Sequence, residues 1–419
     1  MYMYTSNIVV IIMFNSYREI FSAPGTKGFS LAGFIARMPI SMMGIGIVTM
    51  LSQVSGDYWL AGAVAATFTL SSALLAPHIS RMADQLGQSR ILLPTTGISV
   101  FFTILLLLCT KYEAPYWTLF LSALCAGCMP NMSAMVRARW TKLYRGSHKL
   151  HTAFSFESVV DEICFIIGPV LSVSLSVMFF PEAAPLLSSV FLTIGVCLFT
   201  MQKSTEPPVH PRDITNNGTV FKIGSLRVLV FTLIAIGTIF GTIDVVSVAF
   251  AEQQGNTVAA SFVLSVYAIG SCLAGLIFGT LKLNTPPYNQ FLIAVTLSMI
   301  TMLPLVFVNS ITWLVVIVFF AGLSVAPTMI ITMGLVEKIV PESKITEGMT
   351  WAITGLGIGV SLGSAIAGLV IDNFGAHVGF NVAIIAGGLA LTIALLGYKT
   401  LHSAYSHVVI KQDEHSIES

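Results

Sequence analysis

Three acidic side chains interrupt a stretch that is otherwise apolar from residue 150 to residue 180, namely Glu157, Asp161 and Glu162. On insertion scales a charge at the centre of a bilayer costs about 2.5–3.5 kcal/mol, so acids within a membrane helix usually face a wet cavity or the protein interior and mark an ion or proton route. Two adjacent carboxylates do not both ionise easily in a low dielectric, so we expect Asp161 or Glu162 to hold an exchangeable proton. The alternative is a purely structural hydrogen-bonded network.

A cation for these acids is available in another apolar segment. Arg37 lies at a depth in its segment similar to that of Glu157, and Glu157 and Asp161 share one helix face because they are spaced i, i+4. We therefore predict that Arg37 partners Glu157 or Asp161, since mutual neutralisation lowers the cost of burying a charge. The alternative is that Arg37 extends along its own helix to the cytoplasmic interface.

The composition defines the class of protein that must position these residues. The chain of 419 residues is 55% hydrophobic and only 9% charged, whereas soluble domains carry about 25% charged residues. This is the composition of a polytopic membrane protein. A net charge of +1 gives no basic excess to attract nucleic acid, so the expected partners are lipid and small solutes.

The sequence lacks the patterns of several catalytic classes. It contains no GxxxxGK[ST] phosphate loop, and no Ser/His/Asp or metal-ligand constellation stands at an enzymatic spacing. Cys125 and Cys128 form a single CxxC, without the second Cys or His pair that a metal site needs. We therefore expect neither an enzyme nor a nucleotide-driven pump, and no metal or cofactor.

Twelve segments meet the criterion of about 18 predominantly apolar residues for a membrane helix. They lie near 31–53, 58–80, 91–110, 116–136, 152–178, 184–202, 228–250, 258–281, 288–308, 312–336, 348–371 and 377–398. The predicted chain is an all-α integral membrane protein in two six-helix bundles. Its parts are an N-terminal segment (1–30), a first bundle (31–202), a polar, proline-containing linker (203–227), a second bundle (228–400) and a tail (401–419). Asn7–Phe14 is apolar but too short to span.

The distribution of basic residues gives the orientation. An even number of spans places both termini on one side of the membrane. All of the 20 Lys and Arg residues except Lys111 and Arg37 fall in the segments on that side, which the positive-inside rule identifies as the cytoplasm. The sequence predicts a multi-pass protein of the cell (inner) membrane with both termini cytoplasmic.

The two halves of the chain repeat each other. Thr152–Phe156 stands at the same distance before Gly168 as Glu347–Trp351 does before Gly363, and these segments form the fifth and eleventh expected spans. Repetition of six-span halves is typical of transporters. The acids belong to the first half alone, because their counterparts in the second half are Ala352, Leu356 and Gly357.

Two motifs accompany this arrangement. The loop between the second and third spans contains Asp84, Gly87 and Arg90, and the fifth span contains Gly168-Pro169. In these features, and in its two halves of six spans, the chain resembles the major facilitator superfamily from Leu31 to Leu401, and within it the twelve-helix drug:proton antiporters. The resemblance implies the major facilitator fold, with two pseudo-symmetric bundles, and a monomer.

The loop motif departs from the family pattern, because Ser80, Gln85 and Gln88 replace a glycine and basic residues. We expect Gly87 to permit a tight turn. We expect Asp84 to pair with Arg137 or Arg139 and brace a cytoplasmic gate, with an ordinary solvated turn as the alternative.

Gly168-Pro169 predicts a bend in the fifth span, because proline removes a backbone donor and glycine admits a close neighbour. Such a bend can act as a gate pivot. The alternative is a packing kink alone, since both residues are common in membrane helices.

The resemblance also implies that the first, fourth, seventh and tenth helices line a central cavity. Asp244, in the seventh span, would then bind a cationic or hydrogen-bonding substrate; the alternative is a helix-to-helix hydrogen bond. Asn131, in the fourth span, is the second candidate for the substrate cavity.

Together these features predict secondary active transport by alternating access. The Gly-Pro motif favours proton-coupled export of a small amphipathic molecule. A proton-coupled importer of a nutrient or chelate would use the same parts, and a non-transporting membrane receptor is the third possibility, against which the acid cluster argues.

Overall fold

The structure is a computed structural model that describes residues 15–55, 58–209, 219–255, 258–281, 283 and 285–417. These residues form α-helices and short 3-10 turns, without a strand among them. The predicted surface segment at Asn7–Phe14 and the part of the linker at 210–218 lie outside the described residues.

The described chain folds into two compact units. The N-terminal unit comprises residues 18–146 and 160–209, and the C-terminal unit comprises 15–17, 147–159 and 219–417. The division falls inside one continuous helix, α7 (His148–Met178). This helix carries the acid cluster, with Glu157 in the C-terminal unit and Asp161 in the N-terminal unit.

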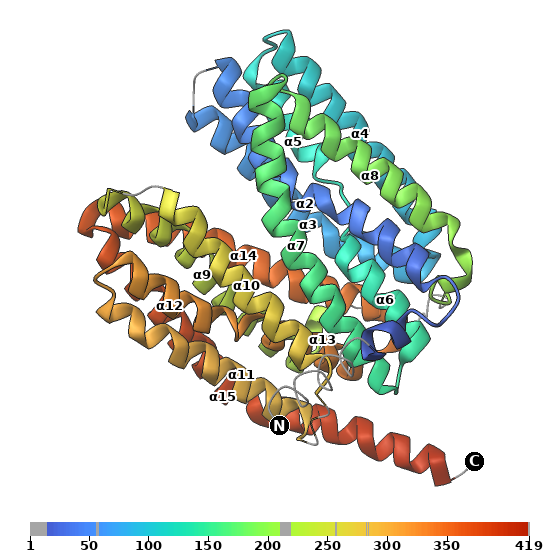
Figure 1. Cartoon of the computed structure of the whole chain (residues 1–419). Helices are drawn as coiled ribbons and strands as arrows, with labels where there is room; N and C mark the ends of the chain where they lie inside the picture. Colours follow the sequence, from blue (N-terminus) through green and yellow to red (C-terminus); the bar gives the residue numbers. More distant parts are fainter. Residues whose placement is uncertain are drawn as a thin grey trace. The chain divides into compact units, whose positions relative to one another are not determined.

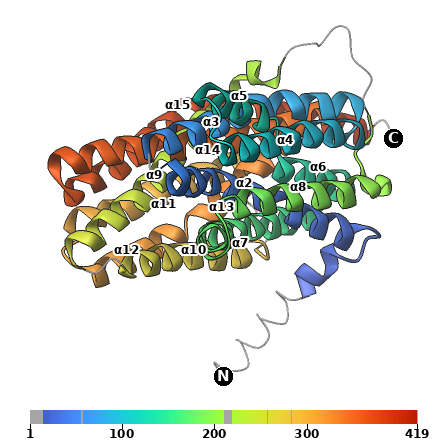
Figure 2. The same ribbon diagram turned by 90° about the horizontal axis from the view of Figure 1, so that it is seen from above.

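Within each unit the helices lie side by side with their axes roughly aligned, as Figure 1 and Figure 2 both show. The other helices of the N-terminal unit are α2 (Thr26–Ser55), α3 (Tyr58–Leu86), α4 (Gln88–Lys111), α5 (Tyr116–Ala126), α6 (Met132–Tyr144) and α8 (Ala183–Met201). Those of the C-terminal unit are α9 (Gly224–Gln253), α10 (Val258–Phe278), α11 (Pro287–Met302), α12 (Ile311–Gly322), α13 (Val325–Ile339), α14 (Ile345–Phe374) and α15 (Ala376–Ile417).

Ten helical segments of the described chain are long and apolar enough to cross a membrane. A helix is the form expected for them, since in lipid every backbone N–H and C=O must find its partner within the segment. Ten of the twelve predicted spans are therefore present at full length. The fourth is divided into α5 and α6, and the described apolar part of the eighth, Phe262–Phe278, is shorter.

The fourth and tenth predicted spans are both interrupted. Helix α5 ends before Pro130, whose ring removes a backbone donor and disfavours a helical conformation at the preceding residue. The chain re-enters a helix at α6, where Asn131 Oδ1 accepts the N–H of Ala134 at 3.0 Å. The tenth span is divided into α12 and α13 at Leu323 and Ser324. The two interruptions thus occupy corresponding places in the two halves.

Glycines permit the closest helix contacts. In the C-terminal unit, Gly363 of α14 lies so near the carbonyl oxygen of Thr238 in α9 that a side chain has no space. In the N-terminal unit, Gly168 of α7 lies in the same way against Ser41 of α2. The same kind of contact therefore recurs at the two glycines that the sequence repeat relates. Helix α7 is continuous through Pro169, so the gate pivot at this position stays a prediction.

Candidate functional site: an arginine–aspartate network

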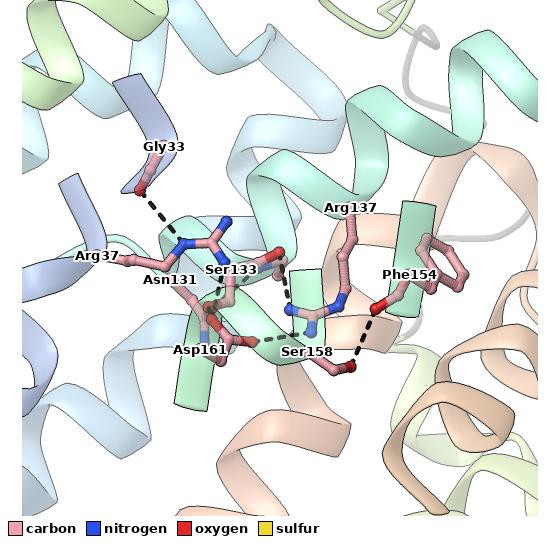
Figure 3. A network of polar contacts seen from close by, with 9 residues as sticks. Gly33, Arg37, Asn131, Ser133, Arg137, Phe154, Ser158 and Asp161 are labelled. Atoms are coloured by element: carbon pink, nitrogen blue, oxygen red, sulfur yellow. Dashed lines mark hydrogen bonds and ion pairs between the residues drawn. The ribbon is translucent and has the colours of Figure 1, made fainter. Parts of the chain in front are cut away.

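A polar network joins three helices of the N-terminal unit at Asp161 of α7 (Figure 3). Arg37 Nη1, from α2, lies 2.8 Å from Asp161 Oδ1, and Arg137 Nη2, from α6, lies 2.8 Å from Oδ2. Ser133 Oγ, also from α6, donates to Oδ1 at 2.7 Å. One carboxylate therefore receives two guanidinium groups and a hydroxyl group.

Each arginine is also fixed to its own helix. Arg37 Nε donates to the carbonyl oxygen of Gly33 at 3.3 Å, and Arg137 Nη1 donates to that of Ser133 at 3.4 Å. Both acceptors lie one turn earlier in the helix. These bonds use some of the N–H groups of each guanidinium and orient others toward Asp161, as Figure 3 shows.

Helices α2 and α7 are held together beside the network. Ser41 Oγ donates to the carbonyl oxygen of Cys164 at 2.8 Å, and Ser172 Oγ donates to that of Met42 at 3.0 Å. Gly168 lies between these two bonds along α7. Because glycine has no side chain, the two helices can approach each other closely there. The fixed distance between the helices keeps Arg37 within reach of Asp161.

Burial distinguishes the members of the network. The side chains of Arg37 and Arg137 are 2% and 0% exposed, whereas that of Asp161 is 21% exposed. Buried cations require compensation, because removing one partner of a buried ion pair leaves a charge that costs several kcal/mol. Asp161 forms an ion pair with both arginines, and its side chain is the most exposed of the three.

Arg37 therefore contacts Asp161, one of its two predicted partners. The other two acids lie on the same helix, with Glu157 fully buried and Glu162 half-buried. The part that any of the three acids takes in proton coupling stays a prediction.

Arg137 and Ser133 were not predicted as members of this network. The expected fourth span ends at residue 136, which places Arg137 among the cytoplasmic loop cations. The structure corrects this, because α6 continues to Tyr144 and both Arg137 and Arg139 are fully buried in it. The spacing i, i+4 of Ser133 and Arg137, which puts them on one helix face, was the available signal.

The loop between α3 and α4 turns at Gly87, as expected, with a φ of 96° that favours glycine. The predicted pairing of Asp84 with Arg137 or Arg139 is wrong. Arg137 binds Asp161, and Arg139 Nε donates to Gln88 Oε1 at 2.9 Å. Arg90, the last residue of the motif, is exposed.

Arg139 belongs to a second polar cluster, here called the α4–α6 clasp, which joins these helices to the chain after α8. Its Nη1 donates to Gln202 O at 2.9 Å and to Thr205 Oγ1 at 2.8 Å, and its guanidinium lies 3.6 Å above the ring of Phe199.

Glu206 completes the α4–α6 clasp at the beginning of α4. Its Oε1 accepts the backbone N–H of Ser89 at 2.7 Å, and its Oε2 accepts the Ser89 hydroxyl at 2.6 Å. A carboxylate is well placed there, because the first N–H groups of a helix have no partners within it and carry partial positive charge.

The C-terminal unit carries the other predicted substrate residue, Asp244 of α9. Its side chain is exposed, and no described residue forms a hydrogen bond or ion pair with it. The helix-to-helix hydrogen bond considered as the alternative thus has no partner in the described chain. Asn131 caps α6, and its place in a substrate cavity stays a prediction.

Metal ligands do not gather in the part of the chain that the structure describes. No group of three or more His, Cys, Asp or Glu side chains there could hold an ion, and the six cysteines are free thiols.

Solved structures of similar fold are membrane transporters. The human organic anion transporter MFSD10 (TETRAN) matches with a TM-score of 0.67 at 13% identity, covering 91% of this chain and 100% of its own. A bacterial homologue of the iron transporter ferroportin, in an outward-facing state, matches with a TM-score of 0.69 at 11% identity, covering 92% and 100%. FucP, a Major Facilitator Superfamily transporter in the outward conformation, matches with a TM-score of 0.65 at 12% identity, covering 88% and 98%. At these identities the likeness shows the fold alone.

The sequence itself gives the family. No curated protein matches the chain, whereas the family model of the Major Facilitator Superfamily matches residues 29–311 and 229–414. This multi-pass membrane protein, with its helices in two units and its transporter neighbours, belongs to the Major Facilitator Superfamily.

Proposed function

We propose that this chain is a proton-coupled secondary transporter that exports a small amphipathic molecule by alternating access. The observation that carries the proposal is Asp161, an accessible carboxylate that holds two buried arginines from two other helices. Membership of a transporter family favours this function over a non-transporting receptor.

Protonation of Asp161 would remove the negative charge from its ion pairs with Arg37 and Arg137. Hydrogen bonds between ions are roughly twice as strong as neutral ones, so both contacts would weaken together and α2, α6 and α7 would lose their common link. The arginines would then favour a conformation that offers them water or another anion. Proton binding would thus shift an equilibrium between two conformations, as coupled transport requires.

Helix α7 can carry this change, because it is continuous from the C-terminal unit into the N-terminal unit. Its first turns are held in the C-terminal unit by the end of α10. His151 Nε2 lies 2.9 Å from the carbonyl oxygen of Phe278, and Thr152 Oγ1 donates to that of Gly279 at 2.8 Å. Release of Asp161 would therefore free the part of α7 around Asp161, while the first turns of α7 stay anchored.

For the substrate site, the interruptions at α5/α6 and α12/α13 give the best pointer. Interrupted helices in corresponding positions of two halves mark binding sites in transporters. We propose that Asn131, at the first interruption, contacts the substrate, and that Asp244 of α9 does so independently. Asp84, Gly87, Arg90, Gly168 and Pro169 serve conformational change rather than binding.

The remaining architecture follows the sequence. We propose twelve spans, with α5 and α6 together forming the fourth and α10 the eighth, in bundles at 31–202 and 228–400. The basic residues place both termini in the cytoplasm of a cell (inner) membrane, and the chain acts as a monomer.

Proton release from inverted vesicles tests the function. With an acidic lumen and a pH-sensitive dye inside, an exported amphipath should cause protons to leave the lumen. Asp161→Asn should abolish this release and preserve exchange of substrate for substrate, whereas Asp372→Asn, an exposed acid at the end of α14, should act like the wild type.

The other outcomes separate the rivals. Proton and substrate movement in the same direction would identify an importer, and neither movement would identify a receptor. Full activity of Asp161→Asn, Glu162→Gln and the double variant would exclude proton coupling through the cluster.

A further inference from the structure

We propose that the substrate is an organic cation, and that the exposed face of α9 around Asp244 binds its charged end. The inference rests on the proposed function, because it names the class of solute for the substrate site suggested there. It assigns the cation-binding face to Phe240, Asp244 and Val248 of α9 and to Tyr267 of α10.

Asp244 is an exposed charge inside a membrane helix. It lies seven residues, or about 10 Å at the rise of an α-helix, before Ala251, where the apolar segment of α9 ends. A carboxylate at this depth does not face lipid, because charges within the hydrocarbon region turn toward a protein interior or a water-filled space. An exposed side chain at this position therefore faces water, where a solute can reach it.

No described residue compensates this charge, since none forms a hydrogen bond or ion pair with Asp244. The network at Asp161 is different, because its acid is held by two arginines from neighbouring helices. A protein that pairs Asp161 so fully and leaves Asp244 open has a free counter-charge for a positively charged ligand. The same comparison disfavours an anionic ligand, because Arg37 and Arg137 are already bound to a carboxylate.

Aromatic rings lie one helical turn from Asp244 along α9. Phe240 precedes Asp244 by one helical turn and shares its face. The Phe240 ring meets the ring of Tyr267 from α10 edge to face, with centroids 6.1 Å apart and planes at 72°. Both rings are half-buried, so each keeps accessible surface for a ligand. Organic cations are attracted to aromatic faces as well as to carboxylates.

The other side of the carboxylate is apolar. Val248 follows Asp244 by one turn and is 46% exposed. The face therefore presents one negative charge between an aromatic pair and an aliphatic side chain. This arrangement fits a molecule with one cationic group and an apolar body, and it gives no partner for a second charge.

Three probes of similar body and different charge test the assignment: benzyltrimethylammonium, benzyl alcohol and benzoate. Each is titrated into the purified full-length protein in detergent, and affinity is obtained from ligand-dependent thermal stabilisation. Benzyltrimethylammonium keeps its charge at every pH, so protonation of the ligand does not affect the result. We expect it to stabilise the wild type at concentrations where benzoate has no effect.

Variants locate the site. Asp244→Asn should lower the affinity for benzyltrimethylammonium at least tenfold, on the order expected for loss of one nearby opposite charge. It should leave the affinity for benzyl alcohol unchanged. Phe240→Leu should lower the affinity for the cation roughly threefold, which corresponds to the energy of a partly exposed cation–π contact. Asp372→Asn is the matched control and should bind as the wild type does. Equal affinity of the wild type and Asp244→Asn, tighter binding of benzoate, or no stabilisation of the wild type by the cation would each overturn the proposal.

The Asp161→Asn variant separates this inference from the proposed function. It should bind benzyltrimethylammonium normally and fail to accumulate it against a gradient. Normal binding together with proton-driven accumulation by Asp161→Asn would remove the coupling mechanism and leave the cation site intact. If Asp161→Asn loses coupling and Asp244→Asn binds the cation as the wild type does, the coupling mechanism stands and the cation site is excluded.

Discussion

One carboxylate serves two arginines in the N-terminal unit, which makes the three side chains interdependent. Arg137→Met should destabilise the protein by about 3 kcal/mol, because it removes a partner from a buried ion pair. Adding Asp161→Asn to this variant should cost less than the two single effects summed, since each removes the same contact. Thermal unfolding of the purified variants in detergent measures the coupling, with exposed Arg90→Met as the control. Strictly additive effects would show that the 2.8 Å contact contributes nothing to stability.

These residues also show which contacts of the network could be predicted from the sequence and which could not. The Arg37–Asp161 contact was predictable as one of two pairings, because a single cation and a group of three acids lay at similar depths in two apolar segments. The part of Arg137 was not predictable, because the sequence does not distinguish an arginine buried within a helix from one in a loop. The difference depends on where α6 ends, and that end is set by tertiary packing around the helix.

Helix contacts built on glycine are the most sensitive feature at the scale of elements. Gly359→Ala in α14 places a Cβ against the backbone carbonyl of Ile234 in α9 and should cost about 1–3 kcal/mol through forced separation of the helices. Gly357, two residues earlier, faces open space. Gly357→Ala should therefore be neutral or stabilise by up to about 1 kcal/mol, because alanine favours a helix. Melting temperatures compare the two, and similar losses in both variants would contradict the packing argument.

The α4–α6 clasp makes a second prediction for elements. Glu206→Gln weakens the bonds that Glu206 accepts from Ser89, and backbone amides of Lys203–Thr205 should exchange about tenfold faster, which corresponds to roughly 1.4 kcal/mol of local stability. Hydrogen–deuterium exchange with mass spectrometry measures this rate. Glu182→Gln is the control, because Glu182 begins α8 without a side-chain capping bond. Unchanged exchange in Glu206→Gln would mean that other contacts hold the segment after α8.

The existence of the helices followed from the sequence, and their interruptions did so only in part. Long apolar segments in lipid have one means of satisfying their backbone, so ten spans were predictable at full length. Pro130 marks the break before α6, and Pro327, the third residue of α13, marks the break at Leu323 and Ser324, because proline has no N–H to donate to the carbonyl oxygen four residues earlier, that of Leu323. Packing adds to this break, since Gly322 lies against the carbonyl oxygen of Tyr267 in α10.

At the scale of the molecule, the two halves share one glycine-mediated helix contact, and they differ in the residues next to that contact. Gly168 and Gly363 each bring the fifth or eleventh helix against the first helix of its own half. In the C-terminal unit further glycines close this contact, whereas in the N-terminal unit the neighbouring space holds Arg37 and Asp161. A tightly packed helix pair resists rearrangement, while an ion pair responds to a proton. Under the proposed coupling, the response to protons would therefore lie in the N-terminal half of a repeated scaffold.

The interrupted fourth span gives a test of the whole topology. If α5 and α6 together cross the membrane once, the exposed residues Tyr112 and Ser147, which flank them, lie on opposite sides. In a chain whose native cysteines are replaced, Tyr112→Cys should react with a membrane-impermeant maleimide in intact cells, and Ser147→Cys in inverted vesicles. Gln85→Cys is the control, because α4 separates it from Tyr112 by an uninterrupted span, so it should react as Ser147→Cys does. Reaction of Tyr112→Cys and Ser147→Cys from the same side would reduce the count of spans, and it would place the C-terminal unit in the opposite orientation to the one the basic residues predict.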